Sequence, residues 1–273
     1  MSSQPASGAA GMPRTWKKPP FITNPITRWS LYLGSLTYLV VAISTINVKW
    51  DRVWEGLPRG LNFVLSFFPP DFFSRSDDII EGFVESLSMT GGSTVIGIAL
   101  SIPIGLGAAR NISPMPIYVV CRGIIALSRA LPELIVAIFM VTMFGFGPFA
   151  GLITLSFATI GFIAKLLAED IEDIDPDQVE SIRATGATWT QMINYAVQPQ
   201  VVPRLVGLSM YRLDINFRES AIIGIVGAGG IGATLNTAID RYEFDSAAGI
   251  LLIIIAIVML AEYSSSLIRR RMV

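Results

Sequence analysis

Long apolar runs separated by short polar segments dominate the pattern of this chain. The first run, residues 29–48, carries no charge and has about 20 residues, enough for one helix to cross a ~30 Å hydrocarbon layer. Later runs predict five more crossings, at about 83–109, 132–146 and 149–167, within about 206–238, and at 247–267. The pattern therefore predicts an all-α membrane protein with six transmembrane helices.

Two of these runs need a further interpretation. The apolar stretch 117–147 is longer than one crossing requires, so we predict a short helix that ends near Arg129 and a crossing that starts at Pro132, because proline is tolerated in the first turn of a helix. For run 29–48, a cleavable signal peptide is the alternative, since Ala42 and Ser44 loosely resemble a cleavage site.

The polar stretches complete the domain organisation. Residues 1–28 predict a disordered basic tail, and 268–273 predict a second, short basic tail. Segment 49–82 mixes aromatic and charged residues, which is typical of an interfacial segment or of a small external cap. The core extends over 83–267 and contains an acidic loop, 169–203, that is too charged to cross a membrane.

Basic residues near the ends of the apolar runs favour one orientation. If the N-terminus is cytoplasmic, about twelve of them, including Arg212, lie on the cytoplasmic side and five lie outside. We therefore predict a multi-pass protein of the cell (inner or plasma) membrane with cytoplasmic N- and C-termini, and an extracytoplasmic segment 49–82.

Composition agrees with a membrane protein and excludes several kinds of chemistry. Apolar residues make up 52% of the chain and charged residues 15%, against roughly 25% charged in soluble domains. Histidine is absent and Cys121 is the single cysteine, which excludes Ser–His and Cys–His nucleophilic pairs, His-ligated metals and thiolate clusters. The 20 basic residues balance 21 acidic ones, so no charge excess points to nucleic acid. We predict no catalytic residue, metal or cofactor.

The acidic loop predicts two short helices around a glycine. Asp175-Pro176 starts the first helix with acidic residues in its first turn, where the helix dipole favours them. Gly186 interrupts, and the second helix, about 189–197, ends before Pro199. Four residues fall near one helical face: Glu180, Arg183, Ala184 and Ala187. The loop is either a solvated connection or a compact knob that contacts a partner.

Three motifs resemble those of ABC importer permeases, in particular the phosphonate-import type. The spacing Glu180–x5–Gly186–x12–Pro199 is similar to their signature loop, although Ser181-Ile182 replace an alanine pair. The segment 129–133 resembles the Arg-x-(Leu/Ile)-Pro step that opens a crossing. The segment 216–232 resembles the Asn-x-Arg-Ser-Ala and glycine-rich stretch of phosphonate permeases, with Glu219 inserted. The resemblance covers about residues 80–267.

The resemblance implies a methionine-importer-like type I permease fold that pairs with a second copy of itself. It implies two copies of a cytoplasmic ABC ATPase and an extracytoplasmic solute-binding protein as partners, so that ATP is hydrolysed elsewhere and this chain is not an enzyme. It also implies a phosphonate or related phosphorus oxyanion as cargo, with methionine or another small solute as the alternative. The ATPase-coupling residues it implies are Glu180, Arg183, Ala184, Gly186, Ala187 and Pro199.

Charged groups within a membrane are costly and tend to mark transport pathways. A glycine-rich break can expose backbone N–H groups that receive anionic oxygens, and close helix packing is the alternative explanation for the glycines. Arg129 and Glu133 lie four residues apart on one helix face, so a mutual pair is the alternative to a pathway role for them. Arg218 would attract the anion, and Glu219 would pair with Arg218 or shape the gate. The predicted path residues are Arg129, Arg218, Glu219, Ser220, Gly227, Gly229 and Gly230.

The glycine cluster also supports a rival hypothesis. Gly227, Gly229 and Gly232 satisfy the GxGxxG pattern of dinucleotide-binding proteins, which would indicate a nicotinamide- or flavin-dependent membrane enzyme. However, only 41 residues follow Gly232, too few for a doubly wound sheet, and 247–261 is a continuous apolar run. A passive channel is a further alternative.

Overall fold

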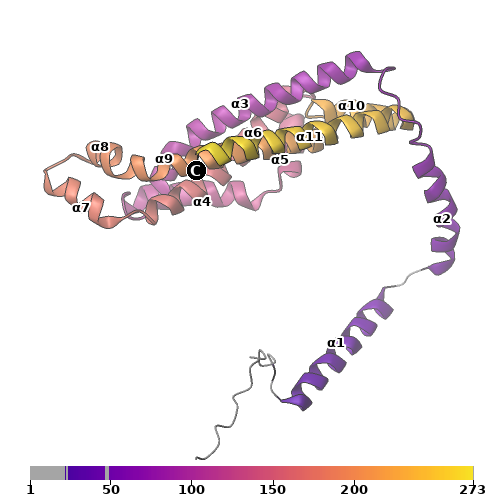
Figure 1. Ribbon diagram of the computed structural model, residues 1–273, viewed down its shortest axis with the longest axis horizontal. Coiled ribbons are helices and arrows are strands. Elements are labelled where there is room, and N and C mark those ends of the chain that lie inside the picture. The colour runs from indigo at the N-terminus through magenta and orange to yellow at the C-terminus, as the bar shows by residue number, and fades with distance from the viewer. Residues whose placement is uncertain (1–21, 23, 47–48, 273) are drawn as a thin grey trace, which may run out of the picture. The chain divides into compact units, whose positions relative to one another are not determined.

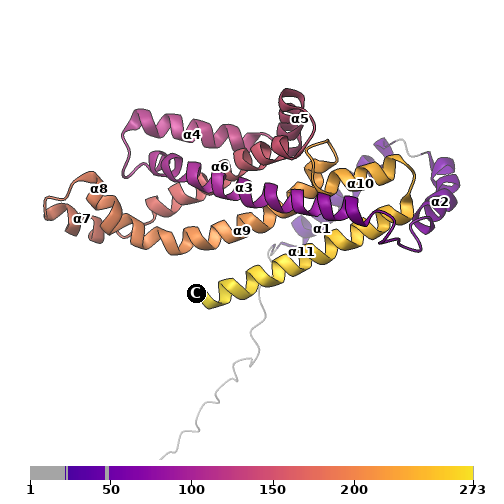
Figure 2. The same cartoon turned by 90° about the horizontal axis from the view of Figure 1, so that it is seen from above.

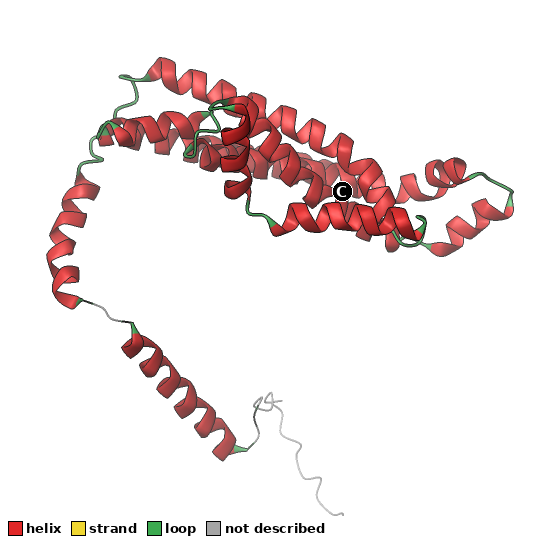
Figure 3. Ribbon diagram, turned by 180° about the vertical axis from the view of Figure 1, so that it is seen from behind, coloured by secondary structure: helices red, strands yellow, loops and turns green. Residues whose placement is uncertain are grey.

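The computed structural model describes residues 22, 24–46 and 49–272, and within these ranges the regular structure is helical, with no strand (Figure 3). The chain divides into two compact units, Met1–Gly60 and Leu61–Val273. The prediction of an all-α protein is confirmed for the described residues. The predicted basic tail falls largely outside them, at residues 1–21 and 23.

The first unit contains helix α1 (Pro25–Thr45) and most of helix α2 (Trp50–Leu65). Helix α1 begins four residues before the predicted boundary because the side chain of Asn24 caps it, accepting a hydrogen bond from the Ile26 N–H at 3.0 Å. Its length and apolar character are sufficient for a membrane crossing.

Four long helices form the core of the second unit and run along the same direction (Figures 1 and 2). They are α3 (Ser76–Ala108), α6 (Pro148–Glu172), α9 (Gln198–Gly224) and α11 (Phe244–Met272). Small residues bring α3 close to α6. A methyl group on Gly97 would lie 2.5 Å from the Thr159 side chain, and one on Gly105 would lie 2.8 Å from Leu167.

Helices α4 (Met115–Ala130) and α5 (Glu133–Phe144) form a broken pair, bent by 95° at Leu131 and Pro132. The predicted helix end near Arg129 is confirmed, and a crossing from Pro132 to about Phe146 stays a prediction. Helix α5 has 12 residues and is ~18 Å long, too short to cross alone, so a span here would have to include the bent α4–α5 pair. Pro132 disfavours helical geometry at the preceding residue, so the break falls there.

Among the described residues, three helices are long and apolar enough to cross a membrane, α1, α3 and α6, with a fourth span if the bent α4–α5 pair is one. Helix α9 has 27 residues and a length of ~40 Å. It is nevertheless polar, because it contains Arg204, Arg212, Asp214, Arg218 and Glu219. Six crossings therefore stay a prediction.

An ion pair closes the end of the core at which α3 begins and α10 (Ile231–Asp240) leads into α11. Arg75 Nε donates a hydrogen bond of 2.6 Å to Glu243 Oε2, and the Asp71 N–H donates to the Asp245 carbonyl at 3.0 Å. The Arg75 guanidinium lowers the pKa of Glu243 below its ordinary value.

The ion pair predicts a pH dependence of stability. Because the pKa of Glu243 is lower in the folded protein, its contribution is present above the unfolded pKa of about 4.3 and is lost as the pH falls through the folded value. We expect the difference in unfolding temperature between the wild type and Glu243→Gln to be constant down to about pH 5 and to shrink below it. Glu81→Gln, an exposed neighbour on α3, is the control, and the same pH response in both variants would contradict the assignment.

Candidate functional site

A polar hairpin, residues 173–197, projects from the end of the core at which α6 ends and α9 begins (Figure 1). Its first helix, α7 (Pro176–Ala184), starts where the Asp175 side chain accepts a hydrogen bond from the Asp177 N–H. Gly186 has a φ of +80°, the left-handed conformation that favours glycine. Helix α8 (Trp189–Met192) follows. Two short helices around Gly186 were predicted and are confirmed.

The predicted helix end before Pro199 is wrong, because α8 continues through a π-helical turn, η1 (Ile193–Val197), directly into α9. In this turn the Gln198 N–H bonds to the Ile193 carbonyl. A proline removes one backbone donor and crowds the preceding turn, and the wider π turn just before Pro199 accommodates both effects. The hairpin is therefore continuous with α9.

An apolar cluster packs the base of the hairpin against the core. Buried side chains from the hairpin, from α9 and from the ends of α3 and α6 pack together: Ala109, Ile112, Leu167, Ile171, Met192, Ala196, Val197 and Val201. Trp189 Nε1 also donates a hydrogen bond to the Ile112 carbonyl at 3.2 Å. The base of the hairpin is thus part of the packed core and not a loose connection.

Glu172, at the end of α6, ties this base to the segment between α3 and α4. Its Oε1 atom accepts hydrogen bonds from the Arg110 N–H at 2.8 Å and from Arg122 Nη2 at 2.9 Å. Asn111 Nδ2 donates to the Ile171 carbonyl at 2.6 Å. A force on the hairpin would consequently reach α3, α4, α6 and α9 together.

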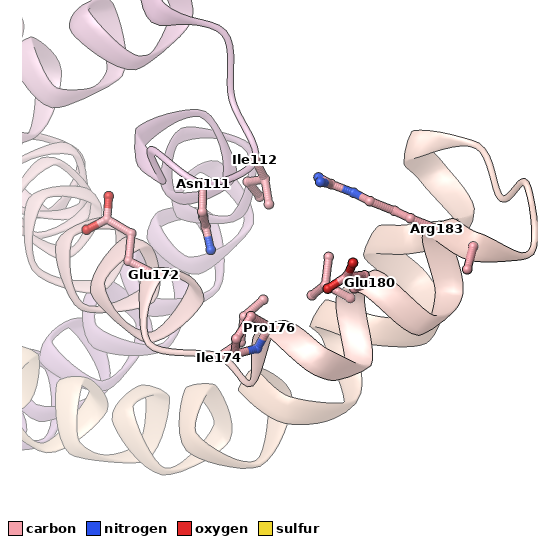
Figure 4. A pocket seen from close by; sticks show the side chains of 9 residues that line it. Asn111, Ile112, Glu172, Ile174, Pro176, Glu180 and Arg183 are labelled. Carbon is pink, nitrogen blue, oxygen red and sulfur yellow. The ribbon is translucent and has the colours of Figure 1, made fainter.

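A pocket of about 740 Å³ lies between α7 and the core (Figure 4). Glu180 and Arg183 line it from α7, and Asn111, Ile112 and Glu172 line it from the core side. The Arg183 side chain extends from α7 into this space, and its Nε donates to Met192 Sδ at 3.2 Å.

The predicted coupling residues are accessible on the hairpin and at its exit. Glu180, Arg183 and Ala184 are exposed and line the pocket. Gly186 is exposed in the turn, Ala187 is half-buried, and Pro199 is exposed in the first turn of α9. The hairpin thus presents an accessible surface on a rigid base, which is the geometry of a docking element.

A second polar feature, the buried polar cluster, lies in the interior of the core. It joins side chains from α3, α5, α6 and α9: Thr94, Glu133, Thr159, Arg212, Asn216 and Glu219. The side chain of Arg212 is 3% exposed. Its Nη2 atom lies 3.2 Å from Glu219 Oε2 and 3.4 Å from Glu133 Oε1, and its Nε donates to Thr159 Oγ1 at 3.2 Å.

Asn216 extends the cluster to α3. Its Nδ2 atom donates hydrogen bonds of 2.9 Å to both Thr94 Oγ1 and Thr159 Oγ1, and its side chain is completely buried. Thr159 Oγ1 in turn donates to the Leu155 carbonyl at 2.6 Å. Buried polar groups are stable only when hydrogen-bonded, so this network fixes how α3, α6 and α9 pack against one another.

The charges of the cluster are unequal, since one arginine faces two carboxylates. A buried charge is costly unless it is paired, and Arg212 pairs with Glu133 of α5 and Glu219 of α9 at once. The arginine also lies over the Phe162 ring, 5.5 Å from its centre. Arg212 therefore holds the broken α4–α5 pair against α9.

The sequence predicts Arg212 only as a basic residue at the flank of a membrane span and not as a member of this cluster. A signal for it exists in the spacing of Arg212, Asn216 and Glu219, which places three polar side chains near one face of α9. The alternative Arg129–Glu133 pair is not formed, because Glu133 pairs with Arg212. Arg218 Nη2 bonds to Asp214 at 2.8 Å and not to Glu219, and a gate role of Glu219 stays a prediction.

Of the predicted path residues, only Glu219 belongs to the cluster. Arg129 is exposed and lies 5.9 Å from the centre of the Phe162 ring, which also stacks against Arg212. Arg218 is exposed on another part of α9. Ser220 is buried, and its hydroxyl donates to the Phe217 carbonyl.

The glycine-rich break between α9 and α10 supports the packing alternative. Gly227, Gly229 and Gly230 have φ values of +91°, +79° and +76°. Backbone N–H groups in this break are hydrogen-bonded to side chains of α3. The Gly230 N–H donates to Glu85 Oε2 at 2.8 Å, and the Ile231 N–H donates to Ser86 Oγ at 2.9 Å. A helix and not a strand precedes the break, which removes the structural context of a dinucleotide fingerprint.

These features define a polytopic helical membrane protein with charges buried in its core and a rigid polar hairpin at one end. Residues 101–273 match the family described as "Binding-protein-dependent transport system inner membrane component", and the chain belongs to this family. The family comprises transport components and not enzymes, and the resemblance to ABC importer permeases is confirmed.

Individual relatives agree with this assignment. The chain is 44% identical over 206 residues to a phosphate-import permease protein, PhnE, of Mycolicibacterium smegmatis, a match that covers 75% of this chain but 39% of that protein. It is 37% identical to the phosphite transport system permease protein PtxC of Stutzerimonas stutzeri, covering 79% of this chain and 78% of the relative.

A solved structure confirms the fold. An inward-facing MetNI methionine ABC transporter matches with a TM-score of 0.62 at 24% identity, covering 71% of this chain and 96% of that one. The predicted methionine-importer-like permease fold is therefore confirmed, and this likeness concerns the fold alone.

Proposed function

We propose that this chain is the membrane-spanning subunit of an ATP-driven importer for a phosphorus oxyanion, namely phosphonate, phosphite or phosphate. The observation that carries the proposal is the rigid hairpin between α6 and α9, since these two helices also carry Thr159 and Arg212 of the buried polar cluster. A displacement of the hairpin would be transmitted along both helices to the interior of the core.

In this proposal the hairpin is the surface on which a cytoplasmic ABC ATPase docks, one ATPase for each of two copies of this chain. Arg110, Arg122, Arg183 and Arg204 lie at the hairpin end, and Arg75 and Arg241 lie at the opposite end. Arg212 is buried and no longer counts as a flanking basic residue. The remaining distribution still favours a cytoplasmic hairpin and cytoplasmic termini. An extracytoplasmic solute-binding protein would then deliver cargo at the end near Arg75.

An exposed ion pair on α9 supports pairing with a second copy. The Arg218 side chain is 52% exposed and bonds to Asp214 four residues before it, well inside a helix that we propose to cross the membrane. Charged side chains inside a membrane face a protein interior or a water-filled path and not lipid. This part of α9 would accordingly face the second copy or the path between two copies.

The cargo assignment is supported by the relatives named for phosphate and phosphite transport, at 44% and 37% identity. The methionine alternative has weaker support, because the methionine transporter matches at 24% identity and indicates the fold alone. Arg212, with two carboxylates around it, offers an anion a cationic group only after the cluster opens.

Uptake measurements test the cargo. With the complete transporter in proteoliposomes, we expect ATP-dependent accumulation of labelled phosphite, phosphate or a phosphonate, and no accumulation of methionine. Flux of the same anions without ATP would contradict an importer and indicate a channel. ATP-dependent uptake of methionine alone would overturn the cargo assignment while preserving the transporter class.

A further inference from the structure

Helix α2 has two sharply different faces. At 100° per residue, its apolar residues fall within an arc of about 120°: Trp50, Val53, Trp54, Leu57, Leu61, Val64 and Leu65. Its polar residues occupy the opposite side: Asp51, Arg52, Glu55, Arg59 and Asn62. Every one of these apolar side chains is exposed, with Trp50 at 62% and Trp54 at 68%.

The last turn of α2, from Leu61, belongs to the second unit, and its contact there does not use the apolar face. Phe63, which lies about 140° from the middle of the apolar arc, packs against Phe67 and Phe244 with ring centres 5.2 and 5.1 Å apart. The C-terminal turn of α2 is thus attached through the other side. In this turn the apolar-face residues Leu61, Val64 and Leu65 stay exposed.

The position of α2 in the chain points to the membrane surface. Helix α1 ends at Thr45 and α3 begins at Ser76, and both are long and apolar enough to cross a membrane. Consecutive crossings are joined on one side of the membrane, so the segment that contains α2 starts and ends at the same surface. With 16 residues, a length of ~24 Å and four charged side chains, α2 itself is unsuited to cross.

Aromatic side chains at the C-terminal end of α2 also indicate a position at the membrane surface. Phe244 contacts both Phe63 and Tyr242, whose side chain is 80% exposed, and nearby Phe68 and Phe73 are 68% and 85% exposed. Tyrosine and tryptophan concentrate where the hydrocarbon layer meets water. The charges of α2 also cancel, two acidic against two basic, so nothing in them favours a strongly charged protein partner.

We propose that α2 is an in-plane membrane anchor, with its apolar face in the boundary between headgroups and acyl chains of the extracytoplasmic leaflet. Its polar face would lie in water. Interfacial helices of this kind bury their apolar face ~5–10 Å into the bilayer. Such an anchor fixes the depth, relative to the bilayer, at which the segment between α1 and α3 enters the core. Membrane lipid, and not another protein, covers the apolar face.

Fluorescence quenching in the complete transporter tests the anchor. In a Cys121→Ser background, the variants Leu57→Cys and Leu61→Cys place a fluorophore on the apolar face, and Glu55→Cys and Arg59→Cys place it on the polar face. The protein is reconstituted in phosphatidylcholine vesicles that contain doxyl-labelled lipid. We expect doxyl lipid to quench the apolar-face labels severalfold more than the polar-face labels, and aqueous iodide to show the reverse order.

Two results would overturn the anchor. Equal iodide quenching on both faces would show that α2 is solvated all round. Apolar-face labels that are shielded from both quenchers, or that lose doxyl quenching when the solute-binding protein is added, would show that the face binds protein. The readout needs neither cargo nor ATP, so a failure here leaves the proposed transport function untouched, and a failed uptake experiment leaves the anchor untouched.

Discussion

Replacing Arg212 with alanine is expected to abolish ATP-driven uptake and to destabilise the protein strongly. The substitution leaves Glu219, 18% exposed, and Glu133, 37% exposed, without their cation and removes a donor to Thr159. Removing one partner of a fully buried ion pair typically costs about 3–5 kcal/mol, and the partial exposure of Glu133 makes this the upper limit here. Thermal unfolding of the purified protein measures the loss of stability, and uptake in proteoliposomes measures the loss of transport.

Two further variants separate a structural role of Arg212 from a role in transport. Arg212→Lys keeps the charge but cannot reach two carboxylates and a hydroxyl with one planar fork, so we expect partial recovery of stability. Arg212→Met combined with Glu133→Gln and Glu219→Gln removes all three charges. We expect this triple variant to regain much of the lost stability while uptake remains absent.

Arg218→Ala is the matched control on the same helix. Within the described residues of one copy, Arg218 is 52% exposed and bonds only to Asp214 in the adjacent turn, so its removal opens no network between helices. The unfolding temperature should therefore fall clearly less than that of Arg212→Ala. A loss of stability equal to that of Arg212→Ala would show that burial of the cluster is not what makes Arg212 important.

The hairpin and the buried polar cluster show which features can be predicted from the sequence alone. Local rules predicted the start of α7 correctly, because Asp175-Pro176 is a cap followed by a proline in the first turn. They do not find the partner of Glu133, because helical spacing offers only a residue about one turn away, such as Arg129. Arg212 instead meets Glu133, 79 positions earlier in the chain, through the packing of α5 on α9. The periodicity of a single helix cannot predict a contact between two different helices.

Prolines show a second limit of prediction from the sequence, which concerns where helices end. Pro132 breaks the chain between α4 and α5 as its sequence indicates, whereas Pro199 lies inside a continuous helix. The difference is the π-helical turn Ile193–Val197, which is stabilised by burial of Ala196 and Val197 in the apolar cluster at the base of the hairpin. Tertiary packing, which the local sequence does not encode, decides whether a proline ends a helix.

Replacing Gly186 with valine is expected to abolish ATP-driven uptake while membrane insertion persists. The residue has a φ of +80°, and nothing lies within 4 Å of the position that a Cβ atom would occupy, so the substitution creates backbone strain and no clash. A β-branched residue in this conformation costs about 1–2 kcal/mol, which the exposed turn between α7 and α8 relieves by changing its shape. The docking surface would then lose its geometry, although its base stays packed.

Gly207→Val and Gly186→Asn are the controls for this prediction. Gly207 also has open space around a Cβ position but lies within helix α9, where valine adds little strain, so its uptake should be normal. Asparagine tolerates the left-handed conformation better than other residues, so Gly186→Asn should retain more uptake than Gly186→Val. Normal uptake by Gly186→Val, measured with equal amounts of inserted protein, would contradict a coupling role for the hairpin.

The ATPase rate of the assembled transporter identifies the step at which Gly186→Val fails. Because the apolar cluster and the Glu172 hydrogen bonds hold the base of the hairpin, a change confined to the turn leaves α6, α9 and the buried polar cluster in place. The unfolding temperature should therefore fall only slightly, in contrast to Arg212→Ala. Hydrolysis that continues without uptake would locate the defect in transmission between the ATPase and the hairpin, where a rigid connection is required.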